Sequence, residues 1–177
     1  LAKAFLAERA ENRTRDLAGA IDAMIALGDR ITGDDVIERA ERAARLMAAN
    51  GYVSVRTHAD TVEYGGLRNV EALVEVRRRV ADVIDLEIVA LTGVPVVGAA
   101  GATHRALLRD ALAAGADLVG GCPHLEPDRA IEAATDVFLE IAADAGVGVD
   151  LHTDETLDPR VMGLEYLATR VVAGFPH

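Results

Sequence analysis

The chain has 177 residues, of which 51% are hydrophobic, with 16 glycines and 5 prolines. This length and composition are typical of a folded domain with a real core, and they exclude a disordered or low-complexity chain. The formal net charge of -11 at pH 7 is spread along the sequence, which disfavours unspecific binding to nucleic-acid phosphates or anionic membranes. We therefore expect no nucleic-acid partner and no membrane partner.

Cysteine usage and hydropathy bear on the cellular setting. Cys122 is the single cysteine, so no internal disulfide can form, and no apolar run approaches the roughly 20 residues that cross a bilayer. No signal peptide is visible, and these features favour a reducing, cytoplasmic setting. Because the chain starts at Leu1 without a methionine and stops abruptly at His177, we expect it to be a fragment of a longer protein.

The first third of the chain is predicted to be a loop followed by two helices. Residues 1–15 show no clear period, whereas Leu17–Leu27 and Asp34–Ala49 have helical patterns. Thr32 supplies a start signal for the second helix, and Asn50-Gly51 ends it just before an extended run. This part of the sequence therefore leads directly into the first predicted strand.

Four short aliphatic or β-branched runs follow, and each precedes a longer helical pattern. The runs start 33, 32 and 30 residues apart, which is the length of one βα unit. They are Tyr52–His58, Asp85–Leu91, Asp117–Cys122 and Val147–His152. The segments between them carry apolar stripes of helical period, such as Val70, Leu73, Val76 and Val80, with charges on the opposite face. The sequence therefore predicts a parallel sheet covered by helices.

The strand faces help to choose between a closed barrel and an open sheet. An open sheet covered by helices on both sides needs two apolar strand faces, but one face of these strands is polar. This favours an α/β fold of the (β/α)8 TIM-barrel type. Since a full barrel usually needs about 250 residues, we predict a partial barrel of about four βα units over residues 1–177. Its parts are a loop at 1–15 after a missing first strand, helices at 16–50 and four βα units at 51–177.

Three charged residues share the polar face, namely Arg56, Glu87 and Asp150. Buried charges must be paired, so we expect these three to form a buried ionic layer beneath the site. The basic run Arg77-Arg78-Arg79 lies opposite an apolar helix face, and we interpret it as a solvated surface.

Functional residues of a barrel lie at the carboxyl ends of its strands. Three of the five histidines, His58, His124 and His152, fall at or just after predicted strand ends. A lone histidine there is more often structural than a ligand, but three at equivalent places favour a site. His152 with Glu155 three residues on has the form that hydrolysis by a metal-activated water requires, although this spacing also occurs by chance.

Four motifs at these strand ends together resemble the cytosine deaminase branch of the amidohydrolase superfamily over nearly the whole chain. They are Val55-Arg56-Thr57-His58-Ala59-Asp60, Asp85-Leu86-Glu87-Ile88-Val89-Ala90, Pro123-His124-Leu125-Glu126 and Val149-Asp150-Leu151-His152-Thr153-Asp154-Glu155-Thr156. The resemblance implies a (β/α)8 barrel that uses one divalent iron or zinc ion to activate water. It also implies removal of ammonia or an amine from a cyclic amidine, which is hydrolysis of a C–N bond other than a peptide bond.

The resemblance assigns roles to five residues. His152 matches the metal ligand of the family's fifth strand, and Glu155 matches the carboxylate that carries protons between the activated water and the substrate. His58, Asp60 and His124 match positions around the substrate pocket. The family's other ligands, a His-x-His pair and an aspartate, are absent from this chain, so we expect weak or no metal binding by the 177 residues alone.

The end of the second predicted strand departs from the family. Leu91-Thr92-Gly93 stands where cytosine deaminases commonly have Phe-Pro-Gln, whose glutamine reads the pyrimidine edge. We therefore expect a small-molecule substrate that is a nitrogen heterocycle or a related C–N compound. The unpaired edges of a half barrel also predict a homo-oligomer. Two alternatives stay open, an inactive fragment or assembly half-barrel and a small-molecule-binding open α/β domain.

Overall fold

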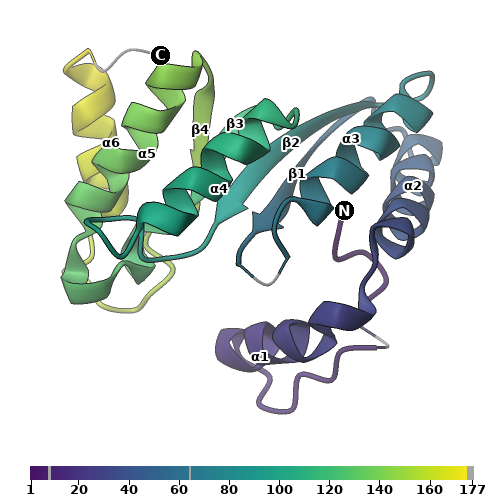
Figure 1. Cartoon of the computed structure of the whole chain (residues 1–177), viewed down its shortest axis with the longest axis horizontal. Coiled ribbons are helices and arrows are strands. Elements are labelled where there is room, and N and C mark those ends of the chain that lie inside the picture. Colours follow the sequence, from purple (N-terminus) through teal and green to yellow (C-terminus); the bar gives the residue numbers. More distant parts are fainter. Residues whose placement is uncertain (8, 64, 175–177) are drawn as a thin grey trace.

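The computed structural model describes residues 1–7, 9–63 and 65–174, so His177 lies outside the described residues (Figure 1). In chain order the helices and strands are α1 (Leu17–Leu27), α2 (Gly33–Ala49), β1 (Ser54–Thr61), α3 (Arg68–Val80), β2 (Asp85–Thr92), α4 (Ala102–Ala113), β3 (Leu118–Gly121), α5 (Ile131–Ala145), β4 (Gly148–Leu151) and α6 (Gly163–Val172). Short 3₁₀ turns are η1 (Gly28–Arg30), η2 (Pro123–Leu125) and η3 (Pro127–Arg129). The two predicted N-terminal helices and all four predicted strands are confirmed, within a few residues at their ends.

The four strands form one parallel sheet in the order β1-β2-β3-β4. Arg56 pairs in register with Glu87, and Gly120 pairs with Asp150. Each crossover returns to the neighbouring strand, and right-handed crossovers in this order place the connecting helices on one face of the sheet. Figure 1 shows α3 and α4 together on one face. This is the arrangement of a barrel segment, and it does not support an open sheet covered on both faces.

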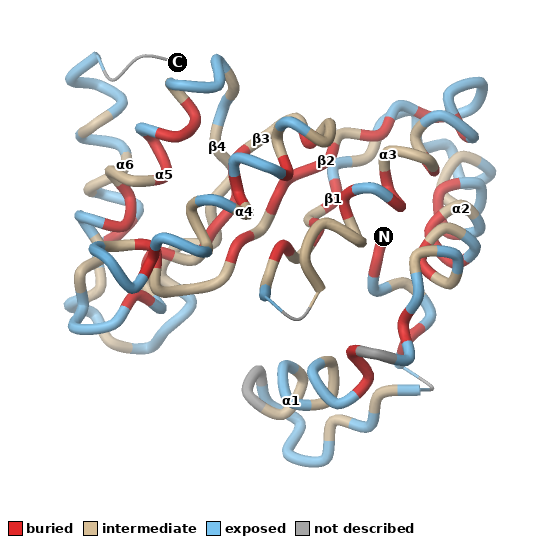
Figure 2. Tube along the Cα trace, in the orientation of Figure 1, coloured by how far each residue is buried: buried red, intermediate tan, exposed pale blue. Residues whose placement is uncertain are grey.

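The core lies between the sheet and these helices (Figure 2). The apolar stripe of α3 is fully buried, and so are the helix-facing residues Ala59, Ile88 and Ala90 of β1 and β2. In α5 the ring of Phe138 packs so closely on β3 that a Cβ at Gly121 would lie 2.1 Å from it. Tight contacts of this kind fix the helices on the sheet and thereby fix the strand ends.

Helix α2 holds the N-terminal segment against the sheet. The Thr32 hydroxyl caps α2 by accepting from the Asp35 amide at 3.2 Å. Arg39 is buried, and its Nη1 donates to the carbonyls of Ala2 and Ala4, each at 2.7 Å. Its charge is balanced by Asp35 at 2.8 Å. Arg39 therefore brings residues near Lys3 to the β1 end of the sheet.

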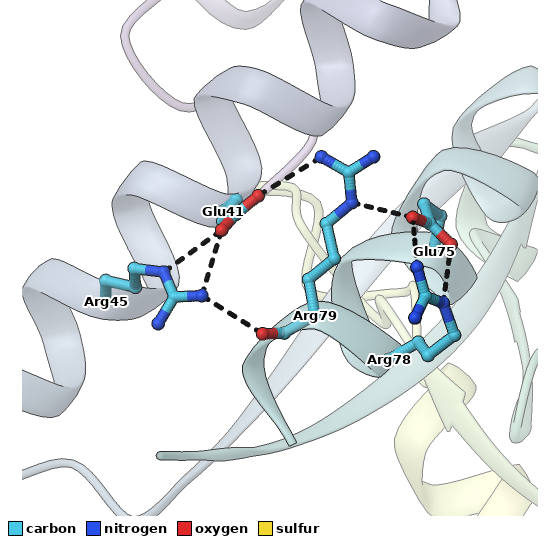
Figure 3. A network of polar contacts seen from close by, with 5 residues as sticks. All are labelled: Glu41, Arg45, Glu75, Arg78 and Arg79. Atoms are coloured by element: carbon cyan, nitrogen blue, oxygen red, sulfur yellow. Dashed lines mark hydrogen bonds and ion pairs between the residues drawn. The ribbon is translucent and has the colours of Figure 1, made fainter. Parts of the chain in front are cut away.

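Ion pairs connect α2 with α3 on the outer surface (Figure 3). Glu41 accepts from Arg45 at 3.0 Å and contacts Arg79 at 3.4 Å, while Glu75 accepts from Arg78 and Arg79. Hydrogen bonds from Arg78 and Arg79 lower the pKa of Glu75 to about 2. Together with the Arg77–Asp117 pair at 2.7 Å, these contacts neutralise the basic run, consistent with a solvated surface.

The face of the sheet opposite the helices carries the predicted ionic layer. Arg56 donates to Glu87 at 2.5 Å and to Asp150 at 2.7 Å, which confirms the pairing. Its expected burial is wrong, because the side chains of Arg56, Glu87 and Asp150 are 49%, 39% and 24% exposed. This face is the inner side of a partial barrel, which these four strands do not enclose, so water reaches the charges. The network ties β1 to both β2 and β4.

Candidate active site

The site is built around the carboxyl end of β4. His152 follows the last residue of this strand, and its amide donates to the Gly121 carbonyl of β3 at 2.9 Å. Two residues later, Asp154 accepts from the amides of Gly163 and Leu164 at 2.7 and 2.9 Å. This carboxylate caps the N-terminus of α6 and anchors the loop. Glu155 is therefore held between a strand end and an anchored helix.

His124, His152 and Glu155 come together at this strand end. His124 Nδ1 lies 3.1 Å from the His152 carbonyl, which can only accept, so Nδ1 is assigned as the donor. Its Nε2 lies 3.8 Å from Glu155, and His152 Nδ1 lies 4.0 Å from the same carboxylate. Both distances exceed a hydrogen bond. His124 Nε2 is buried without a hydrogen-bond partner among the described residues, and Glu155 is the charged group it faces.

His58 occupies a different place from the one expected. β1 extends to Thr61, so His58 lies three residues before the strand end and not at it. Its ring centre is 4.7 Å from that of His152, and its Nε2 is 3.3 Å from Asp150 Oδ1. Burial alone would raise the pKa of Asp150, but hydrogen bonding from Arg56 and the charges of His58 and Arg56 lower it overall. His58 thus lies beneath the site and supports His152.

A cavity of about 460 Å³ opens at the strand ends. Its polar lining includes His152, Glu155, Asp60, Lys3 and Thr92. Lys3 pairs with Asp60 at 2.8 Å. The remaining walls are largely apolar and come from α1 and from the ends of β1, β2 and β3. Of the five expected site residues, Asp60, His152 and Glu155 line the cavity, whereas His58 and His124 contact His152 from outside its lining.

Cys122 also lines this cavity, at the end of β3. Burial raises the pKa of its thiol to about 11, and the charges of Glu155 and Asp60 act in the same direction. A thiol with this pKa is protonated at neutral pH and is a poor nucleophile. The arrangement therefore disfavours thiol catalysis at Cys122.

Two supporting residues had no role in the sequence interpretation. Glu126 is buried, and its carboxylate accepts from the amides of Val96 and Val97 in the loop after β2. Lys3 faces Asp60 across the cavity wall. Glu126 belongs to the motif Pro123-His124-Leu125-Glu126, but contacts across 29 to 57 residues leave no local signal in the sequence.

The chain's residues fit part of a metal site. His152 presents an imidazole to the cavity beside a carboxylate, which is the donor chemistry of catalytic zinc and iron sites. Within residues 1–7, 9–63 and 65–174, no three His, Cys, Asp or Glu side chains gather to hold a metal ion. These residues can therefore contribute a ligand without completing the site.

Comparison with known proteins agrees with this geometry. The pterin deaminase of Rhizobium rhizogenes is 33% identical over 177 residues, covering 97% of this chain and 39% of that protein. The N-isopropylammelide isopropyl amidohydrolase of a Pseudomonas species is 26% identical over 161 residues, covering 90% of this chain and 38% of that protein. The crystal structure of 5-methylcytosine deaminase from Klebsiella pneumoniae liganded with phosphonocytosine has a TM-score of 0.86 and 33% identity, over 97% of this chain and 42% of that chain.

No protein-family model matches the sequence. The fold and site define the class as part of a (β/α)8 barrel whose functional residues lie at the carboxyl ends of its strands. Within this class the chain is a partial member of the amidohydrolase superfamily, of the cytosine deaminase-like kind. It spans about two fifths of the length of the relatives described above. Deaminases of this superfamily generally depend on a metal ion.

Proposed function

We propose that this chain is part of a metal-dependent hydrolase that removes ammonia or an amine from a nitrogen heterocycle or cyclic amidine. The observation that carries the proposal is the group formed by His124, His152 and Glu155 at the end of β4, beside a cavity. The similarity to a pterin deaminase, an isopropylammelide amidohydrolase and a 5-methylcytosine deaminase supports the reaction type. Residues 1–177 form one partial barrel in this proposal.

Each residue has a role in the proposed reaction. His152 is a metal ligand, and the ion, Fe²⁺ or Zn²⁺, supplies an activated water molecule when bound. Glu155 would be the carboxylate that holds and transfers protons between the attacking water and the leaving nitrogen of the substrate. His124 belongs to the surroundings of the pocket, where its Nδ1 contact with the His152 carbonyl holds the strand end that carries the site. His58 and Asp60 complete the surroundings of the pocket.

The partners and setting follow from the same proposal. The partner is a small-molecule substrate, and we expect a homo-oligomer in a cytoplasmic setting, because a lone cysteine suits a reducing compartment. None of the described helices is long and apolar enough to cross a membrane. The 177-residue chain contributes one proposed metal ligand, His152. The alternative hypothesis of an inactive or assembly fragment therefore concerns this chain, whereas the proposed activity concerns the whole protein.

The test is amine release by the protein produced at the full length of its gene. The substrates are cytosine, 5-methylcytosine, pterin and N-isopropylammelide, with metal content measured on the same sample. We expect Glu155→Gln to lower kcat by roughly 100-fold or more, which is the usual contribution of a positioned acid–base group. His152→Ala should lower both activity and metal content.

Glu140→Gln is the matched control, because Glu140 is an exposed glutamate on α5 away from the cavity. It should keep wild-type activity and metal content. A Glu155→Gln variant that is folded and within a few-fold of wild type would contradict the assignment of Glu155. Absence of amine release from all four compounds, with metal bound, would contradict the substrate class.

A further inference from the structure

Helix α1 presents an apolar face to the strand ends. Ile21, Met24 and Ile25 follow the i, i+3, i+4 spacing that places side chains on one side of a helix. All three line the cavity beside His152 and Glu155. Figure 1 shows α1 apart from the helices that pack on the sheet. Leu27 and Met24 of α1 join the core, whereas Ile21 and Ile25 face the cavity.

Part of this apolar wall is open to solvent. Ile21 is 45% exposed and Ile25 is 52% exposed, and Leu125 on the other side of the same cavity is 46% exposed. Single exposed aliphatic side chains are ordinary, but these three line one cavity together with His152 and Glu155. An apolar part of a ligand bound in this cavity would therefore contact them.

The polar groups lie elsewhere in the cavity. Lys3 and Asp60 pair with each other, which leaves His152 and Glu155 at the end of β4 to meet a polar ligand group. Leu91 and Val94 at the end of β2 are apolar and lie two strands away. Neighbouring strands are about 4.8 Å apart, so the two ends are separated by about 10 Å. A ligand that reaches both must extend beyond a single ring.

We propose that Ile21, Met24, Ile25, Leu91, Val94 and Leu125 form an apolar subsite for an alkyl or aryl substituent of the substrate. The carbon that loses its amine lies at His152 and Glu155, and the substituent points away from it toward α1 and β2. The position of the reacting carbon rests on the proposed function. The preference for an apolar substituent depends on the cavity wall alone, so binding measures it without turnover.

The experiment compares the binding of cytosine and 1-butylcytosine by calorimetry, using the protein at the full length of its gene. The butyl group is attached to the ring nitrogen opposite the amine-bearing carbon. We expect 1-butylcytosine to bind at least about 10-fold more tightly, the discrimination that an apolar pocket gives for small alkyl groups. Ile25→Gln should reduce this ratio several-fold. Met24→Gln is the second variant should the first fail to fold.

Leu164→Gln is the matched control, because Leu164 on α6 is 58% exposed and does not line this cavity. It should leave the ratio unchanged. Binding of 1-butylcytosine no tighter than that of cytosine would overturn the subsite, as would a wild-type ratio in the folded α1 variants. A butyl preference without release of ammonia would support the subsite and contradict the proposed deamination. Ammonia release without a butyl preference would support the proposed deamination and contradict the subsite.

Discussion

At the scale of a single residue, the thiol pKa of Cys122 depends on the negative charges around the cavity. Its thiol pKa is raised from 9.0 to about 11 by burial and by the nearby carboxylates of Glu155 and Asp60. Only the thiolate reacts with alkylating reagents, and each pKa unit changes its fraction tenfold below the pKa. The rate of alkylation therefore measures whether Glu155 lies near this thiol.

We predict that Cys122 in the metal-free 177-residue chain reacts with iodoacetamide at pH 8 about 100-fold more slowly than an unperturbed thiol. The rate should rise steeply up to about pH 11. Glu155→Gln removes a negative charge and should lower the thiol pKa, so alkylation at pH 8 becomes faster. Glu140→Gln should have no such effect. Alkylation of the folded wild-type chain at the rate of a free thiol would contradict the burial.

Gly93 and His104 form a second residue-scale pair, on the wall formed by the end of β2. A Cβ at Gly93 would lie 3.0 Å from His104 Nε2 and 3.4 Å from Val62 Cγ1. The His104 ring is held from its other side, where Nδ1 is 2.9 Å from the Pro95 carbonyl. Any side chain at position 93 must therefore push the His104 imidazole aside. A glutamine at this position would not fit unless His104 moved.

We predict that Gly93→Ala lowers the free energy of unfolding by about 1 kcal/mol, because the ring must move and its hydrogen bond weakens. In a His104→Ala background the same change should cost little, since the obstacle is gone. Urea unfolding of the double-mutant cycle measures this coupling. Gly33→Ala, where an added Cβ meets nothing within 4 Å, is the control. Equal costs in the two backgrounds would disprove the clash.

At the scale of elements, the loop between β2 and α4 is fixed by contacts from two directions. Glu126 accepts from the amides of Val96 and Val97 at 2.9 and 3.1 Å. From α4, Arg105 Nη1 donates to the carbonyls of Val96 and Gly98. The start of this loop forms part of the cavity wall, so Glu126 is a positioning residue for the site.

We expect Glu126→Gln to lower the free energy of unfolding by about 1–3 kcal/mol, because an amide nitrogen would face a buried backbone donor. Urea unfolding followed by circular dichroism measures the loss. Glu140→Gln, which changes an exposed glutamate in the same way, should change stability by less than about 0.5 kcal/mol. If the two variants unfold at the same urea concentration, the carboxylate does not hold the loop.

The sequence predicted elements better than the contacts between them. Helical period and strand alternation depend on neighbouring residues, so Leu17–Leu27 and the four strands were located correctly. The strand face alone also predicted the pairing of Arg56 with Asp150. The exposure of that pair, the extension of β1 beyond His58 and the role of Glu126 depend on tertiary packing. The position of α1 beside the cavity likewise has no signature in its local pattern.

At the scale of the whole molecule, the described sheet has two unpaired edges, β1 and β4. Unpaired backbone groups along a strand can pair with another chain. Just before β1, Val53 is 78% exposed, and its carbonyl accepts from the Asp85 amide on the inner side. The net charge of -11 opposes association, so self-association should be reversible and favoured by salt.

We predict that the isolated 177-residue chain self-associates, giving a light-scattering mass above 18.7 kDa that rises with concentration. Val53→Lys places a charge at the β1 edge, where lysine blocks strand pairing, and should weaken association by roughly 10-fold. Leu157→Lys is the control, because Leu157 is fully exposed in the loop after β4 and away from β1. Both substitutions add one positive charge, so a difference in association between the two variants comes from the β1 edge and not from the net charge.

A monomer mass at every concentration, or equal effects of the two lysines, would show that β1 is not the associating edge.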